Sequence, residues 1–248
     1  MKQFVITSSM GKRLIARGMV RHPAVAAVLK KGRLAIVAGT TNGYVAEEIL
    51  GAIGQADGFS RVGFRRGVTI APGASAPPAP PPPDVVIVDG QWLKGKELFD
   101  VVNDMQAGDV ILKGGNALDV SRGLAAALVA HPMGGTIAAS IPAVIGRRVR
   151  LLVPIGLEKR VEGDLNELAA LCNDPATEGP RMVVIPGVTF TELDAIALLT
   201  GATATLIAAG GVLGAEGAVW VHVRGAPPEI HAAEQLIHSV SREPPCQA

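Results

Sequence analysis

The sequence contains few aromatic residues and few cysteines. It has two Trp, one Tyr and five Phe in 248 residues, although 48% of its residues are hydrophobic, so small aliphatic side chains must fill most of the core. This balance excludes disordered, collagen-like and coiled-coil proteins. Cys172 and Cys246 lie far apart and fit neither a disulfide framework nor a CxxC metal site. We therefore expect a globular protein in a reducing compartment, the cytoplasm.

We also predict that the sequence contains neither a targeting segment nor a membrane segment. The apolar run from Phe4 to Ile6 is too short for the core of a signal peptide. Two stretches, 123–146 and 195–215, contain no Asp, Glu, Lys or Arg and are long enough to cross a bilayer. Both are rich in Ala, Thr and Gly and contain turn-forming residues. We interpret them as buried segments of a globular core and expect no membrane partner.

Several common chemical signatures are absent. The sequence has no Walker GxxxxGK[ST] motif and no GxSxG motif. Its five histidines lack the spacing of metal ligands, so we predict no metal site. Nothing in the sequence indicates a bound cofactor, and we expect none. Clusters of aromatic and basic residues are missing too, which argues against a nucleic-acid partner.

Charge is distributed unevenly along the chain. No acidic residue precedes Glu47, and residues 1–83 carry eleven Lys and Arg against three acidic residues, whereas residues 84–248 carry twelve against nineteen. The basic first third favours an anionic ligand or partner. Arg13, Arg17 and Arg21 are spaced by four residues and share one helical face, which we interpret as a solvated surface. The alternative is a basic docking surface for nucleic acid or protein.

The chain alternates between helical and strand patterns. This alternation predicts an α/β fold with a doubly wound, mostly parallel sheet. Residues 1–180 form the expected core and include a proline-rich exposed loop at 71–83, and residues 181–248 form a possible small α+β lid. Strands are expected near 34–38, 61–64, 84–88, 109–112, 150–154, 182–185, 204–208 and 217–223. Helices are expected near 10–31, 45–50, 96–106, 117–130 and 228–240, and after capping boxes at Asp164 with Glu167 and Thr189 with Glu192.

Ligands of parallel sheets bind at the carboxyl ends of strands, so the loops there are the candidate sites. The first candidate loop follows the strand at 34–38 and leads into a helix. Its glycines, hydroxyl groups and free N–H groups are suited to binding phosphate. The alternative is an ordinary strand-to-helix turn. The loops at 134–136 and 187–194 occupy similar positions. The predicted phosphate-binding residues of the first loop are Gly39, Thr40, Thr41, Asn42 and Gly43.

The second candidate loop follows the strand at 109–112. It places a cation beside exposed backbone donors in the run Lys113-Gly114-Gly115-Asn116. A carboxylate can move a proton between adjacent carbons while a lysine stabilises the oxyanion, and Asp119 and Asp89 are the candidate carboxylates. The alternative is that Asp119 only caps a helix or lies on its surface, and that Asp89 only forms a turn with Gly90.

The order of these parts resembles the superfamily of type A ribose-5-phosphate isomerase, glucosamine-6-phosphate deaminase and CoA transferases. The resemblance covers roughly residues 10 to 120. It rests on Gly-Thr-Thr-Asn at 39–42, Asp-Gly at 89–90 and Lys-Gly-Gly-Asn-Ala-Leu at 113–118. It implies an isomerase-like fold with a phosphate loop and a site lysine. The second acidic pair of the isomerase is replaced by Trp92 and Leu93, and the general-base Glu is not matched.

We therefore expect a small anionic, phosphorylated metabolite as the ligand. In the leading hypothesis the chain is an isomerase-like sugar-phosphate enzyme, in which the loop at 39–43 holds phosphate, Lys113 holds the oxyanion and Asp119 or Asp89 moves the proton. The alternative is a non-catalytic ligand sensor or regulatory protein on the same scaffold, which the missing acidic residues favour. We also expect a homo-oligomer.

Overall fold

The computed structural model describes residues 1–67, 69–70, 72–73 and 82–246. These residues form a mixed α/β protein with three β-sheets, so the predicted α/β class is confirmed. The predicted proline-rich loop at 71–83 lies mostly outside the described residues. No helix among the residues described is both long and apolar enough to cross a membrane.

The largest sheet has six strands in the order β10-β8-β5-β2-β3-β4. The first four strands of this order are parallel to one another, but β3 is antiparallel to β2 and β4 is antiparallel to β3. The sheet is therefore mixed. Its strands are β2 (Arg33–Ile36), β3 (Val85–Val88), β4 (Gln91–Trp92), β5 (Val110–Leu112), β8 (Arg150–Pro154) and β10 (Val188–Phe190).

The prediction that residues 84–88 form a parallel strand is wrong in direction. Ile36 at the end of β2 pairs with Val85 at the start of β3. After β2 and the following helix, the long connection from 53 to 84 returns the chain to the carboxyl end of β2, so β3 enters the sheet from that edge. The strand predicted at 61–64 does not form, because residues 61–64 adopt a turn and irregular backbone instead.

Two smaller antiparallel sheets flank the central one. The order of the first is β1-β12-β11 and that of the second is β6-β7-β9. Each of the three sheets joins strands from both sides of residue 180, and the division of the chain there stays a prediction. The strands are β1 (Lys2–Ile6), β6 (Ala117–Asp119), β7 (Leu124–Val129), β9 (Arg181–Val184), β11 (Thr203–Ala209) and β12 (Val219–Arg224).

The helix predicted at 117–130 is wrong, because this segment is the β6–β7 hairpin. Its alanines favour a helix in isolation. The Asp119 side chain instead accepts hydrogen bonds from the backbone N–H groups of Ser121 and Arg122, and Gly123 adopts a φ of 64°, which closes a turn. Pairing of β7 with β9 then outweighs the local helix preference.

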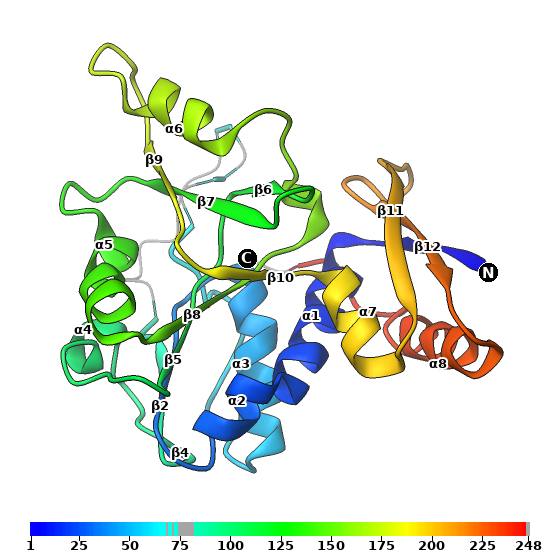
Figure 1. Cartoon of the computed structure of the whole chain (residues 1–248), viewed down its shortest axis with the longest axis horizontal. Coiled ribbons are helices and arrows are strands. Elements are labelled where there is room, and N and C mark those ends of the chain that lie inside the picture. Colours follow the sequence, from blue (N-terminus) through cyan, green and yellow to red (C-terminus); the bar gives the residue numbers. More distant parts are fainter. Residues whose placement is uncertain (68, 71, 74–81, 247–248) are drawn as a thin grey trace.

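Helices lie on both sides of the central strands. In Figure 1, α2 and α3 lie on one side of β2, β5 and β8, and α4 and α5 lie on the other. The helix predicted at 96–106 is only one turn long, and the one predicted at 10–31 is interrupted at His22. The helices are α1 (Ser8–Arg21), α2 (Pro23–Val28), α3 (Thr40–Ala52), α4 (Leu98–Val101), α5 (Gly135–Ile141), α6 (Leu165–Asn173), α7 (Glu192–Thr200), α8 (Pro227–His238), and the short segments η1 (Pro142–Gly146) and η2 (Leu157–Lys159).

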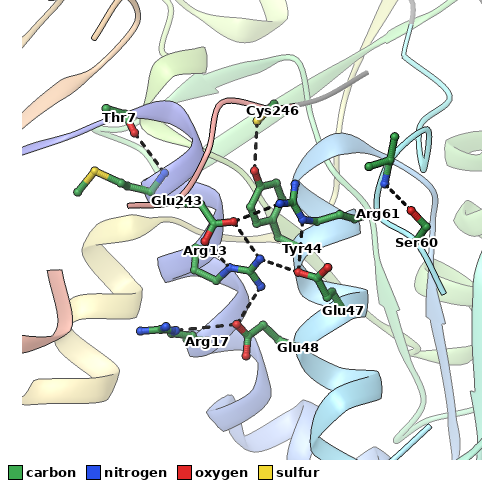
Figure 2. A network of polar contacts seen from close by, with 12 residues as sticks. Thr7, Arg13, Arg17, Tyr44, Glu47, Glu48, Ser60, Arg61, Glu243 and Cys246 are labelled. Carbon is green, nitrogen blue, oxygen red and sulfur yellow. Dashed lines mark hydrogen bonds and ion pairs between the residues drawn. The ribbon is translucent and has the colours of Figure 1, made fainter. Parts of the chain in front are cut away.

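An ion network around Arg13 ties α1 to α3 and to the C-terminal segment (Figure 2). The Arg13 guanidinium donates to Glu47 at 2.6 Å and to Glu48 at 2.9 Å, both on α3. Glu243, which follows α8, accepts from Nε and Nη2 of Arg13 at 3.0 Å each. The Arg13 side chain is only 11% exposed. The prediction of a solvated arginine face is therefore wrong at Arg13.

Tyr44 and Arg61 extend this network. The guanidinium carbons of Arg13 and Arg61 lie 4.8 Å and 4.3 Å from the centroid of the buried Tyr44 ring, within cation–π range. Arg61 also contacts Glu47 and Glu243 at 3.4 Å each. These contacts hold the C-terminal segment against the helices that follow the first two strands.

Replacement of Arg13 should destabilise the fold. In Arg13→Ala, Glu47, Glu48 and Glu243 lose their shared partner, and we expect the free energy of unfolding to fall by about 3 kcal/mol, as when a buried ion pair is broken. Urea denaturation measures this change. Arg21→Ala is the matched control, because Arg21 is exposed on the same helix. This variant should change the free energy of unfolding by less than about 0.5 kcal/mol. Equal losses in the two variants would contradict this interpretation.

Candidate functional site

A large cavity opens at the carboxyl ends of β2 and β5. Its volume is about 1370 Å³. Both candidate loops line it, because β2 and β5 are neighbouring parallel strands and their following loops leave the sheet at one edge. The predicted residues that line the cavity are Gly39, Thr40, Thr41, Asn42, Lys113, Gly114, Gly115 and Asn116. Gly43 does not line it.

Helix α3 presents its N-terminus to this cavity. The helix begins at Thr40 after Gly39, and no side chain caps it. The N–H groups of its first turn have no acceptor within the helix and carry the positive end of the helix dipole. The Thr41 hydroxyl is buried and has no hydrogen-bond partner in the described part of the chain. These donors form the kind of arrangement that binds a phosphate group.

Asn42 fixes the position of this helix start. Its side-chain amide donates to the carbonyl oxygen of Val37 at 2.8 Å and to that of Leu112 at 3.0 Å, and the residue is fully buried. Lys113, which follows Leu112 in the chain, donates its backbone N–H to the Leu152 carbonyl at 3.0 Å. Asn42 and Lys113 therefore tie the ends of β2, β5 and β8 to the first turn of α3.

Lys113 lies in this cavity without a hydrogen-bond or ion-pair partner among the described residues. Burial lowers the pKa of Lys113 to about 8, and the charges of Lys159 and Arg66 act in the same direction against the opposing charge of Asp84. A fraction of this side chain is therefore an uncharged amine near neutral pH, and an anion beside it would restore the charge.

Three further cations line the cavity. Arg65 and Arg66 come from the irregular connection before β3, and Lys159 comes from η2. Lys159 donates to the Gly115 carbonyl at 2.9 Å, and Arg66 contacts the carboxylate of Glu97 at 3.0 Å. No Asp or Glu occurs among the described residues that line the cavity. Its interior therefore favours anions.

Sequence reasoning missed these three cations. The double arginine lies in a stretch predicted partly as a strand, and Lys159 follows no motif. The cavity lining also has an apolar portion, to which Leu128, Phe99 and Met133 contribute. Met133 is 78% exposed and Phe99 is 49% exposed.

The structure places Asp89 away from the cavity. Because β3 is antiparallel to β2, Asp89 lies at the opposite end of the sheet, where its side chain accepts from the Gly32 N–H at 2.8 Å. Asp84 occupies the cavity end of β3 instead. It is buried and accepts from the N–H groups of Ala38 and Leu98 at 2.8 Å and 2.9 Å, so it supports the wall of the site.

Asp119 also lies outside the cavity lining. It is the last residue of β6, and its carboxylate accepts from the Ser121 hydroxyl at 2.6 Å and from the Arg122 N–H at 3.1 Å. The hydrogen bond from Ser121 and that from the Arg122 backbone lower the pKa of Asp119. The expected proximity of Asp119 and Asp89 to Lys113 is not what the structure shows.

A buried acidic and basic cluster lies behind Lys159. Lys12 of α1 contacts Glu158 at 2.8 Å, and Glu192 accepts from the Leu157 N–H at 3.0 Å. Burial raises the pKa of Glu192 to about 8, and the charge of Glu158 adds to the effect. The prediction that Thr189 and Glu192 form a capping box is wrong: the cap consists of Thr191 and Asp194.

No group of three or more His, Cys, Asp and Glu side chains within the described ranges could hold a metal ion. Comparison with protein-family models, with curated proteins and with solved structures found no match for the chain.

Conversion of the Asn42 amide to a carboxylate should destabilise the fold. In Asn42→Asp, a buried carboxylate faces the carbonyl oxygens of Val37 and Leu112 with no donor between them, and we expect a loss of about 3 kcal/mol in the free energy of unfolding. Urea denaturation measures it. Asn103→Asp, a surface control, should change stability by less than about 0.5 kcal/mol. Retention of full stability in Asn42→Asp would mean that this contact is not structural.

Glu192 should make stability depend on pH. Its pKa is raised in the fold from 4.5 to about 8, so the folded state holds a proton that the unfolded state releases. Stability from this group is present below about pH 4.5 and is lost as pH rises towards 8. Glu192→Gln should flatten that decline in urea denaturation, whereas Glu167→Gln, an exposed control, should leave it unchanged. An equally steep decline in Glu192→Gln would contradict the assignment.

Proposed function

We propose that this protein binds a small phosphorylated metabolite in the cavity between the start of α3 and Lys113. The observation that carries the proposal is the pairing of an uncapped helix N-terminus with a lining that holds Lys113, Lys159, Arg65 and Arg66 but, among the described residues, no acidic side chain. The unpartnered Thr41 hydroxyl adds a donor at the same place. Phosphate is the common ligand that uses such donors and charges together.

The resemblance to the ribose-5-phosphate isomerase superfamily supports this ligand class. The Gly-Thr-Thr-Asn and Lys-Gly-Gly-Asn segments follow neighbouring parallel strands, as the resemblance implies. We propose that the four parallel strands, with helices on either side, are the part of the sheet that corresponds to the doubly wound scaffold (Figure 1). Homo-oligomer formation and a cytoplasmic location stay predictions.

An isomerase-like reaction needs a group that moves a proton. Asp119 and Asp89 lie elsewhere, so they cannot serve Lys113 directly in this arrangement. His131 lines the cavity, and its Nδ1 accepts from the Met133 N–H at 3.1 Å, which leaves Nε2 for proton transfer. The second candidate function is a non-catalytic ligand sensor, which the shortage of carboxylates at the cavity favours.

Inorganic phosphate and pyrophosphate should bind to the purified protein in isothermal titration calorimetry. Lys113→Met should weaken pyrophosphate binding by about tenfold or more, because it removes a charge-assisted contact. Thr41→Val should weaken it several-fold, since a neutral hydrogen bond contributes about 1 kcal/mol.

Lys94→Met is the matched control for the lysine substitution. Lys94 is exposed beside β4, at the far end of the sheet, and its loss should leave the dissociation constant unchanged. Unchanged affinity in both Lys113→Met and Thr41→Val would exclude the cavity as the phosphate site.

A further inference from the structure

Lys113 differs from Lys12 and Lys159, the other two lysines that are not exposed. Lys12 contacts Glu158 at 2.8 Å and Ser8 at 3.1 Å, and Lys159 donates to the Gly115 carbonyl at 2.9 Å. Lys113 is half-buried in the cavity, yet its amine has no hydrogen-bond acceptor or carboxylate partner within the described ranges. Such a lysine has the setting of a nucleophile, since an amine that is held by a carboxylate stays protonated and unreactive.

The surroundings of Lys113 disfavour its protonated form. Arg65, Arg66 and Lys159 line the same cavity. Asp84, whose charge opposes theirs at Lys113, already accepts hydrogen bonds from two backbone N–H groups and from Arg66. Burial and the neighbouring cations lower the pKa of Lys113 to about 8. About a tenth of the molecules therefore carry the free amine at pH 7.

The ligand position follows from the Asn42 contact. Because the Asn42 amide holds the Leu112 carbonyl at 3.0 Å, the first turn of α3 lies beside the residue that precedes Lys113. A phosphate at the first turn of α3 would place the rest of a small metabolite in the same cavity as the lysine amine.

We propose that Lys113 forms an imine with the carbonyl group of a phosphorylated aldehyde or ketone. The inference rests on the proposed phosphate-binding function and names the reactive part of the ligand. The amine nitrogen attacks the carbonyl carbon and gives a carbinolamine. One proton of the nitrogen moves to the carbonyl oxygen to form the hydroxyl group of the carbinolamine. This hydroxyl group then leaves as water with the second proton of the nitrogen, and a C=N bond replaces C=O. No electrons are gained or lost, so the step needs no redox partner.

The resulting imine would serve either function. Once protonated, it withdraws electrons from the adjacent carbon and makes a proton there easier to remove, with His131 as the available base in the cavity. A reversible imine also lengthens the residence of a carbonyl ligand on a non-catalytic sensor. The carboxylates that the isomerase hypothesis required are unnecessary for its formation.

Pyridoxal 5′-phosphate, a phosphorylated aldehyde, provides a direct probe. The full chain is incubated with it, reduced with borohydride and mapped by peptide mass spectrometry. Lys113 should be the main labelled residue, and inorganic phosphate should slow its labelling. Pyridoxal without the phosphate should label Lys113 at least about tenfold more slowly, since it lacks the charge-assisted contacts. The labelling rate should rise roughly tenfold per pH unit and level off near the pKa of about 8.

Lys113→Arg is the key variant, because it keeps the charge and removes the nucleophile. It should lose the adduct at position 113, while Lys30→Arg, at an exposed lysine, should be labelled at Lys113 as fast as wild type. If pyrophosphate binds but Lys113 is labelled no faster than Lys30, the imine proposal is wrong and the phosphate site stands. If neither pyrophosphate binds nor phosphate protects, the proposed function fails as well.

Discussion

The side-chain amide of Asn42 donates to Val37 and Leu112 and so joins the ends of β2 and β5 to the first turn of α3. The geometry of the site depends on this contact. The two carbonyl groups belong to neighbouring parallel strands, and the loops that follow those strands carry Thr40, Thr41 and Lys113. Because a buried amide donor has no substitute in this position, the helix N-terminus and the lysine stay at a fixed separation.

The basic residues in the first third of the chain have two different roles in the fold. Arg13 and Arg61 are bound to Glu47 and Glu243, so their charge is used to hold helices and the C-terminal segment together (Figure 2). Arg65 instead lines the cavity, where it joins Lys113 from the loop after β5 and Lys159 from η2. Some basic residues of this segment are therefore neutralised in an ion network along α3. Others produce a positive potential that attracts anions near the N-terminus of α3.

Part of the site could be predicted from the sequence. The two glycine-containing loops follow short apolar runs, and the parallel pairing of those runs brings them together as expected. The position of Asp89 could not be predicted, because a continuous run of Val and Ile indicates a buried strand without indicating its direction. The hydrophobic pattern is the same for both strand directions. In the structure the acidic residue at the cavity end of β3 is Asp84, which is buried outside the cavity lining.

Other features depend on contacts between distant residues. The alanines at 125–127 favour a helix locally, but they pair with β9, more than fifty residues further along the chain. Lys159 reaches the cavity only because η2 follows β8, and Glu192 is buried against Lys12 and Glu158 although an acidic residue at a helix start is usually exposed. Local patterns carry no signal for such placements.

A crystal of the protein soaked in inorganic phosphate tests the central claim most directly. The account predicts a tetrahedral anion within hydrogen-bond distance of the backbone N–H groups at the start of α3, with the Lys113 amine turned towards it and the Thr41 hydroxyl in contact. A phosphate bound only at other surfaces, with the cavity filled by protein side chains, would contradict the account.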